Sequence, residues 1–160
     1  SDLMDKVSED RYPKRVMTSF VCQYMLAQTY PDMFDSNKTV SVFSPEAATL
    51  EAHHVIPLGT AKKVGEVTAN IRKDPKHICN SPLNFVLITK EANKTISDDA
   101  LDVYAKKITP GAKSALNITS YVSEDSASTR DKIHSILENR FDMLNGNVQT
   151  TINNKLMNWK

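Results

Sequence analysis

The chain has 160 residues, of which 40% are hydrophobic and 24% charged, and these values are typical of one globular domain with a buried core. The sequence contains no apolar run of membrane-spanning length and no secretory signal, so we expect a cytoplasmic domain without a membrane partner. Two cysteines, Cys22 and Cys79, are too few for a disulfide framework. Cys22 lies in an apolar stretch, which predicts a core position.

The net charge of +1 does not by itself indicate a nucleic-acid-binding protein, but the distribution of charge is uneven. Residues 1–61 carry five basic and eight acidic side chains, whereas residues 62–113 carry ten basic and six acidic ones. Phosphate binding requires a local basic patch rather than a basic protein. The middle third is therefore the candidate phosphate-binding region, although a solvated charged surface explains the same distribution equally well.

The first half of the chain predicts one helix and two strands. Residues 13–30 predict the helix, because apolar side chains recur at spacings of three and four and Pro13 suits its first turn. The segments after it are a loop at 32–47 with an extended piece at 39–43, a short strand within 48–57, a long loop at 59–82 with room for a helical turn, and a strand at 83–89.

The second half predicts three helices. Ser97 is expected to cap the first of them, and Pro110 with Gly111 is expected to end it. Residues 114–125 indicate no single structure. The remaining predicted helices are 128–145, with Ser128 in a capping box and an end near Gly146, and 148–159.

Four polar residues fall at the ends of the central elements. His53 and His54 lie at the end of the first strand, Asn84 opens the second strand, and Asn93 lies at the start of the helical region. A strand end that faces a helix start across a tight hairpin can bring such side chains around one pocket. We therefore expect these residues to form a site.

These are the groups that phosphodiester hydrolysis needs. A histidine can take a proton from the attacking water, because its ordinary pKa is near neutral. A divalent cation can stabilise the charge on the phosphate and on the leaving oxygen. Imidazole nitrogen and amide oxygen can both hold such a cation.

Three segments resemble the three parts of an HNH (ββα-metal) endonuclease: Glu51-Ala-His53-His54-Val-Ile-Pro57, Leu83-Asn84-Phe-Val-Leu-Ile-Thr and Ala92-Asn93-Lys-Thr-Ile-Ser. The resemblance implies that His53 and Asn93 are metal ligands and that His54 is the general base. It implies that Asn84 is the structural member of the catalytic motif and ties down the loop between the strands. The implied cofactor is one Mg²⁺ or Mn²⁺ ion, with Zn²⁺ less expected, and the implied products carry a 5′-phosphate and a 3′-hydroxyl.

The pattern is also similar to the C-terminal nuclease half of GmrSD-type modification-dependent restriction enzymes, over about residues 49–108. In those enzymes an NTPase-like N-terminal half senses modified DNA. The similarity implies a DNA-cleaving effector of a restriction or anti-phage defence system, with an upstream sensor or NTPase domain in the natural chain. The start at Ser1 fits an excised or processed domain. RNA as the substrate, and a homodimer, stay open.

The predicted fold is α+β, with a ββα-metal core and a short antiparallel hairpin inside one mainly helical domain, residues 1–160. Lys90 and Lys94 flank Asn93 and are the preferred candidates for contacting nucleic acid. Further candidates for phosphate contact are Lys62, Lys63 and Arg140. Glu51 shares a strand face with His53 and is expected either to orient a ligand or to be an exposed acid.

Two alternatives stay open. His77 and Cys79 form a His-x-Cys pair, and together with His53 they could build a structural zinc module. This alternative leaves Asn84 and Asn93 unexplained. The other alternative is a noncatalytic nucleic-acid-binding module that keeps the fold.

Overall fold

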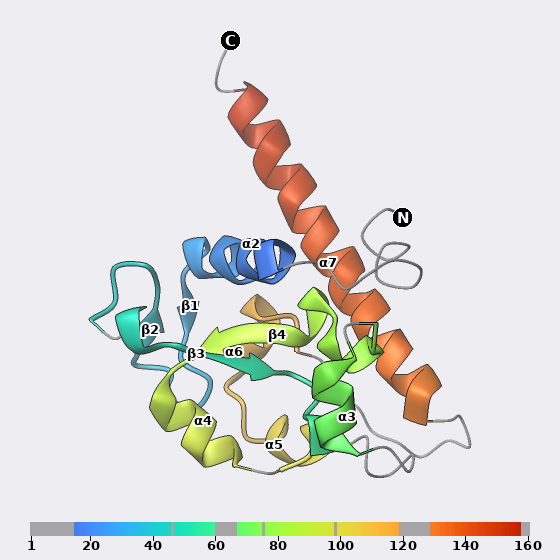
Figure 1. Ribbon diagram of the computed structural model, residues 1–160. Helices are drawn as coiled ribbons and strands as arrows, with labels where there is room; N and C mark the ends of the chain where they lie inside the picture. The colour runs from blue at the N-terminus through green and yellow to red at the C-terminus, as the bar shows by residue number, and fades with distance from the viewer. Residues whose placement is uncertain are drawn as a thin grey trace.

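The computed structural model describes residues 15–45, 47–59, 67–74, 76–97, 99–118 and 129–157. Helices pack around two small antiparallel sheets of two strands each, so the predicted α+β class is confirmed. Figure 1 shows one of these hairpins at the centre of the molecule and the C-terminal helix running past one side of it.

The first described helix, α2 (Arg15–Ala27), lies within the predicted segment 13–30 and ends before the segment does. It ends because Thr29 adopts a φ of 56°, which a helix does not allow. The Thr29 N–H donates to the carbonyl of Leu26 and closes the last turn. This turn sends the chain away from the helix axis and into the first strand.

The first sheet pairs β1 (Tyr30–Pro31) with β2 (Thr39–Val40) in antiparallel register. Between them, one carboxylate oxygen of buried Asp32 accepts hydrogen bonds from the N–H groups of Phe34 and Asp35, at 2.9 and 3.2 Å. The extended piece expected over 39–43 is confirmed only for Thr39 and Val40, which form β2.

The central hairpin pairs β3 (Glu51–His54) with β4 (Phe85–Ile88) in antiparallel register. His53 lies opposite Val86, and His54 lies opposite Phe85. Both strands fall inside the segments 48–57 and 83–89 that were predicted to contain them. Before β3 the chain forms one 3₁₀ turn, η1 (Ala47–Thr49).

The connection between β3 and β4 contains more regular structure than a loop with one helical turn. Its described elements are α3 (Thr68–Lys73) and the 3₁₀ turns η3 (Ile78–Asn80) and η4 (Pro82–Asn84). Buried Ile71 anchors α3 to the core, and buried Cys79 anchors η3. The expectation of a mostly irregular 59–82 segment is wrong in this part.

Helix α4 (Lys90–Ile96) begins directly after β4. The Thr89 hydroxyl caps it by accepting from the Ala92 N–H at 3.2 Å, and donates to the Asp32 carboxylate at 2.5 Å. Since Thr89 and Asp32 are both buried, this pair fixes the start of α4 against the first sheet.

Two boundary predictions in the next segment are wrong. Ser97 does not open a helix but follows the last turn of α4, with a φ of 49°. Pro110 does not end a helix but begins α6 (Pro110–Ala115), because the Thr109 side chain caps that helix and proline needs no N–H partner in a first turn. Between them lies the short helix α5 (Leu101–Tyr104).

The C-terminal segment forms one helix, α7 (Thr129–Met157), rather than the two predicted over 128–145 and 148–159. Gly146 does not interrupt it, because glycine costs a helix only about 1 kcal/mol and keeps its backbone N–H. The predicted cap Ser128 lies outside the described residues. Figure 1 shows the C-terminal part of α7 extending beyond the rest of the domain.

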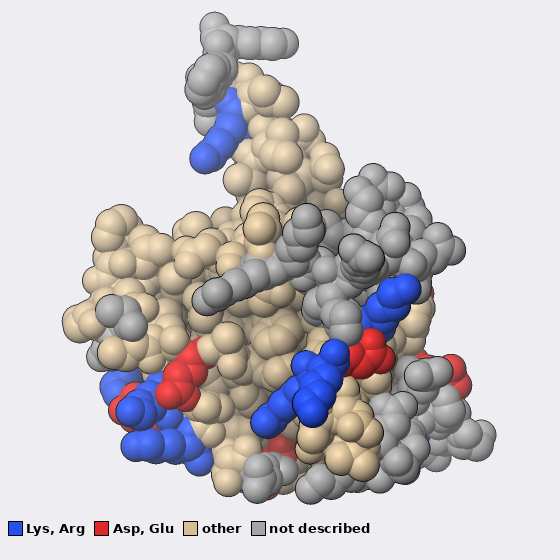
Figure 2. Space-filling view, in the orientation of Figure 1, with Lys and Arg blue, Asp and Glu red and all other residues tan. Residues whose placement is uncertain are grey.

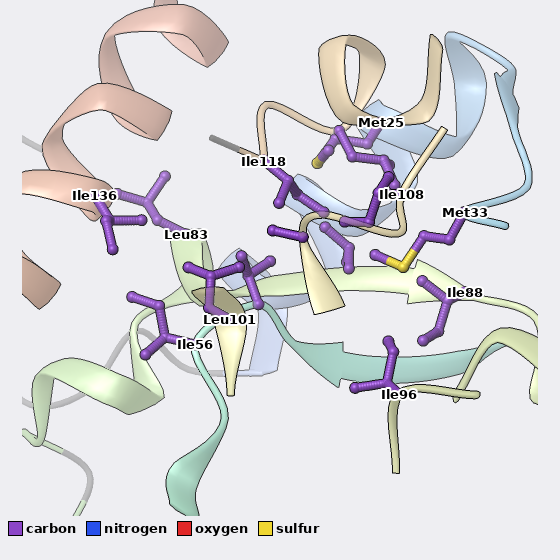
Figure 3. Close-up of a cluster of buried hydrophobic side chains, with 14 of the residues drawn as sticks. Met25, Met33, Ile56, Leu83, Ile88, Ile96, Leu101, Ile108, Ile118 and Ile136 are labelled. Atoms are coloured by element: carbon purple, nitrogen blue, oxygen red, sulfur yellow. The ribbon is translucent and has the colours of Figure 1, made fainter. Parts of the chain in front are cut away.

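The hydrophobic core lies between the central hairpin and the helices, and it draws side chains from nearly every element. Figure 3 shows the residues that meet there: Met25, Met33, Ile56, Leu83, Ile88, Ile96, Leu101, Ile108, Ile118 and Ile136. Cys22 is buried, as predicted. Over the described ranges, no helix is both long enough and apolar enough to cross a bilayer.

Candidate metal and catalytic site on the central hairpin

His53 lies in β3 and points to the same side of the strand as Glu51, because strand side chains alternate between the two faces. It is 9% exposed, and its ring packs edge-on against Tyr104 of α5, with the ring centroids 5.7 Å apart. Burial lowers the pKa of His53 from its ordinary value to about 4, while its interaction with Asn93 acts in the opposite direction. At neutral pH the imidazole is therefore uncharged and can act as a ligand.

Asn93 lies in α4, and its side-chain amide meets both of these β3 residues. Its Nδ2 donates to the Glu51 carboxylate at 2.6 Å, and its side chain also interacts with His53. Folding therefore brings His53, Glu51 and Asn93 together, which places the two predicted metal ligands beside each other. Glu51 is half-buried and touches one of those ligands, so it is not merely an exposed strand acid.

His54 is the last residue of β3, and its surroundings differ from those of His53. Its ring lies against the ring of Phe85, its cross-strand partner, with the centroids 4.3 Å apart. Burial lowers the pKa of His54, its hydrogen bond with Asn80 opposes that shift, and the charge of Arg72 adds to it. The charge of His54 also contributes to lowering the pKa of His53.

Asn80 of η3 interacts with His54 through its side chain. The Asn80 Nδ2 donates to the carbonyls of Ile71, at 2.6 Å, and Asp74, at 2.9 Å. Its side-chain oxygen is therefore the atom left to accept a hydrogen bond from the His54 ring. His54 Nε2 has no partner among the described residues, so a neutral ring that donates from Nδ1 to this oxygen would keep its lone pair on Nε2.

The Nε2 atoms of both histidines are buried, and within the described part of the chain neither finds a hydrogen-bond partner. Buried polar atoms in folded proteins are nearly always paired, because an unpaired one costs free energy. Each of these two Nε2 atoms therefore has a lone pair or hydrogen that a further group can bind.

Asn84 lies in η4, one residue before β4, and is fully buried. Its side chain accepts from the Ile56 N–H at 2.7 Å and donates to the carbonyls of Ile56 and Cys79, at 3.1 and 2.7 Å. These three bonds tie the segment after β3 to η3 and to the start of β4. The Asn84 side chain thus bonds to backbone groups of neighbouring segments, and among the described residues none of these bonds involves the ring of His53 or His54.

The basic candidates differ in their placement. Lys90 and Lys94 are exposed on α4, on the helix that carries Asn93. Lys62 and Lys63 lie outside the described residues. Arg140 is a wrong candidate for phosphate contact, because its 3% exposed guanidinium donates to backbone carbonyls of the core. These carbonyls belong to Leu83, Phe85, Leu116 and Asn117.

Sequence reasoning missed two residues beside His54, namely Arg72 and Asn80. Both fall in the 59–82 segment, where weak periodicity predicted at most one helical turn and did not locate α3 or η3. The only signal that included Arg72 was the excess of basic side chains over 62–113. For Asn80 the sequence offered no signal, since its role depends on how η3 packs against β3.

The proposed zinc module is not assembled in the described structure. No three His, Cys, Asp or Glu side chains gather there as potential metal ligands, and this includes His53, His77 and Cys79. His77 instead uses its Nδ1 to accept from the Cys79 N–H at 3.2 Å, as the cap of η3. The group of His53, Glu51 and Asn93 falls outside this definition, because only His53 and Glu51 belong to those four residue types and Asn93 does not.

In the comparisons with known proteins, no family model matched the chain, and no curated protein or solved structure matched it either.

Proposed function

We propose that the chain is a metal-dependent endonuclease that hydrolyses phosphodiester bonds of DNA, with an HNH-type site on the central hairpin and α4. The observation that carries the proposal is the pair of buried, unpaired Nε2 atoms of His53 and His54 among the described residues. Both imidazoles are uncharged at neutral pH, and His53 lies beside Glu51 of its own strand and Asn93 of α4, which bond to each other.

The residues around His53 fit a divalent cation. His53 Nε2 and the Asn93 side-chain oxygen would hold the cation, and the Glu51 carboxylate would keep the amide turned by accepting from Nδ2. A mixed nitrogen and oxygen donor set suits Mn²⁺, and Mg²⁺ also tolerates few protein ligands because it retains several waters. When bound, such a cation supplies charge stabilisation for the phosphate and the leaving oxygen.

His54 is suited to take a proton from the attacking water. With its Nδ1–H donated to the Asn80 oxygen, the neutral ring would carry its lone pair on Nε2. Its lowered pKa keeps most of the rings in the neutral form at pH 7, and only the neutral form can act as a base. Protonation would give a cation whose Nδ1–H remains bonded to Asn80.

The motif resemblance supports DNA as the substrate and a restriction or anti-phage system as the setting. Neither α3 nor α4 carries an aromatic side chain on which bases could stack, and their exposed charges are suited to phosphates. We therefore propose weakly specific cleavage, with the target chosen by an upstream sensor or NTPase domain.

The test is nicking of supercoiled plasmid with Mg²⁺ or Mn²⁺ by the wild-type chain and by His54→Ala. We expect nicking by the wild type, its loss in EDTA, and a large decrease in His54→Ala. His134→Ala is the matched control, because His134 is exposed on α7 and pairs with Glu138 at 3.3 Å. DNA binding without nicking by the wild type would favour the noncatalytic module, and equal nicking by His54→Ala would remove His54 from the mechanism.

A further inference from the structure

Basic side chains occur on both sides of the central hairpin. Arg72 and Lys73 lie in the last turn of α3 and are exposed, and Lys90 and Lys94 are exposed on α4. Figure 2 shows Lys and Arg side chains gathered over α3 and, separately, over α4, with mostly uncharged surface between them. In the same orientation, Figure 1 shows the hairpin running between these two helices.

The α3 basic group (Arg72 and Lys73) is held in place next to His54. Buried Ile71 anchors α3, and the Asn80 side chain bonds to the carbonyls of Ile71 and Asp74 at the end of the helix. The same Asn80 side chain meets the His54 ring. One residue therefore joins the end of α3 to the candidate base.

The α4 basic group (Lys90 and Lys94) is also fixed relative to the hairpin. Thr89 caps α4 and bonds to buried Asp32, and Asn93 of the same helix bonds to Glu51 in β3. Each basic group is thus tied by side-chain hydrogen bonds to the strand that carries both histidines. This connection distinguishes the two groups from cations scattered over a solvated surface.

The simpler explanation for the α3 group is its position at a helix end. Cations in the last turn of a helix interact favourably with the helix dipole, typically by about 0.3–1 kcal/mol. That explanation covers Arg72 and Lys73 alone and does not account for a second basic group on the opposite side of the histidines. It also predicts no dependence of DNA binding on these side chains, which makes the two explanations distinguishable.

We propose that the α3 and α4 basic groups are two phosphate-binding subsites for duplex DNA, and that the DNA lies across the central hairpin with one backbone segment on each group. The inference rests on the proposed function for the position of the cleaved phosphate, beside His54 between the two subsites. It assigns Arg72 and Lys73 to substrate binding. Contacts to phosphates carry no sequence information, so the surface binds without reading bases.

The test measures binding of a fluorescein-labelled DNA duplex by fluorescence anisotropy in EDTA, where no cleavage occurs, over a range of NaCl concentrations. The variants are Arg72→Gln with Lys73→Gln, and Lys90→Gln with Lys94→Gln. Lys155→Gln is the matched control, because Lys155 is exposed in the last turn of α7, far from the hairpin. All the altered side chains are exposed, so the variants should fold.

Each lost phosphate contact should reduce the slope of log Kobs against log salt by about 0.9, so each double variant should lose up to about 2. Lys155→Gln should keep the wild-type slope. An α3 variant with the wild-type slope would overturn the proposal, and so would tighter binding of an RNA duplex or a single strand by the wild type. Plasmid nicking by the wild type separates the two proposals. If the wild type nicks DNA but the double variants keep its salt slope, only the subsite proposal is wrong. If the double variants change the slope but the wild type does not nick DNA, only the nuclease proposal is wrong.

Discussion

The side-chain amide of Asn93 donates a 2.6 Å hydrogen bond to the carboxylate of Glu51, which lies 42 positions earlier in the chain. This bond joins α4 to β3 and sets the orientation of the amide beside His53. Because Nδ2 is used by Glu51, the amide oxygen is the atom that faces His53, where a cation would also bind. Glu51 is thus a positioning residue for a proposed ligand.

Replacing Glu51 should weaken metal binding without removing a ligand. Loss of an outer partner of a metal ligand typically costs about 10–100-fold in metal affinity, and we expect Glu51→Ala to weaken Mn²⁺ binding within that range. Glu51→Gln keeps an acceptor for Asn93 and should lose less. Isothermal titration calorimetry with Mn²⁺ measures both changes.

The control for this comparison is Glu91→Gln, which removes an exposed carboxylate from the same helix as Asn93. It should leave the Mn²⁺ affinity close to the wild-type value. If Glu51→Ala binds Mn²⁺ as tightly as Glu91→Gln does, the hydrogen bond does not orient a metal ligand.

Replacing Asn84 should destabilise the whole domain. Asn84→Ala removes three side-chain hydrogen bonds, two of which serve the N–H and the carbonyl of buried Ile56. Leaving such groups unpaired costs about 1–3 kcal/mol each, so the free energy of unfolding should fall by at least about 2 kcal/mol. Urea denaturation followed by circular dichroism measures this change.

Asn145→Ala on the exposed face of α7 serves as the comparison, and its effect should stay within about 0.5 kcal/mol. An Asn84→Ala protein as stable as Asn145→Ala would show that the loop after β3 does not depend on this side chain.

The continuity of α7 predicts that one glycine can be replaced with a gain in helix stability. A Cβ at Gly146 meets nothing within 4 Å, so Gly146→Ala should stabilise α7 by about 0.5–1 kcal/mol. At Gly111 a Cβ would lie 3.2 Å from Pro31 Cγ, so Gly111→Ala should gain less or lose stability. Hydrogen exchange of the α7 amides and thermal unfolding would report these effects.

Equal exchange rates along α7 in the wild type and in Gly146→Ala would contradict a helix that passes through this position. If two separate helices met near Gly146, as the sequence pattern predicted, Gly146→Ala would leave the stability of the protein unchanged or lower it.

The sequence predicted the parts of the fold that depend on local patterns. The helix over 13–30 was predicted because its apolar side chains recur at helical spacing, and the strand over 83–89 because it is a short, apolar, β-branched run flanked by polar residues. The sequence also predicted that His53 and Asn93 would lie near each other, and the fold brings their side chains together. These features can be recognised within a few neighbouring residues.

The rest depended on tertiary packing that no local pattern encodes. Arg140 looked like a surface cation, but it satisfies several core carbonyls and is therefore buried. Pro110 was predicted to end a helix, but it begins α6 because the Thr109 side chain caps that helix. The contact between Asn80 and His54 joins residues 26 positions apart, and it depends on the packing of α3 and η3, for which the residues show no periodic pattern.

The most direct measurement is the plasmid nicking rate as a function of Mn²⁺ concentration for the wild type, Asn93→Ala and His54→Ala. A ligand variant and a base variant should change different features of this curve. Asn93→Ala should need more Mn²⁺ for half-maximal rate and approach the wild-type plateau. His54→Ala should keep the wild-type half-maximal Mn²⁺ concentration, with a plateau lowered by about 10²–10⁴-fold. Three superimposable curves, or a His54→Ala plateau equal to that of the wild type, would contradict the account.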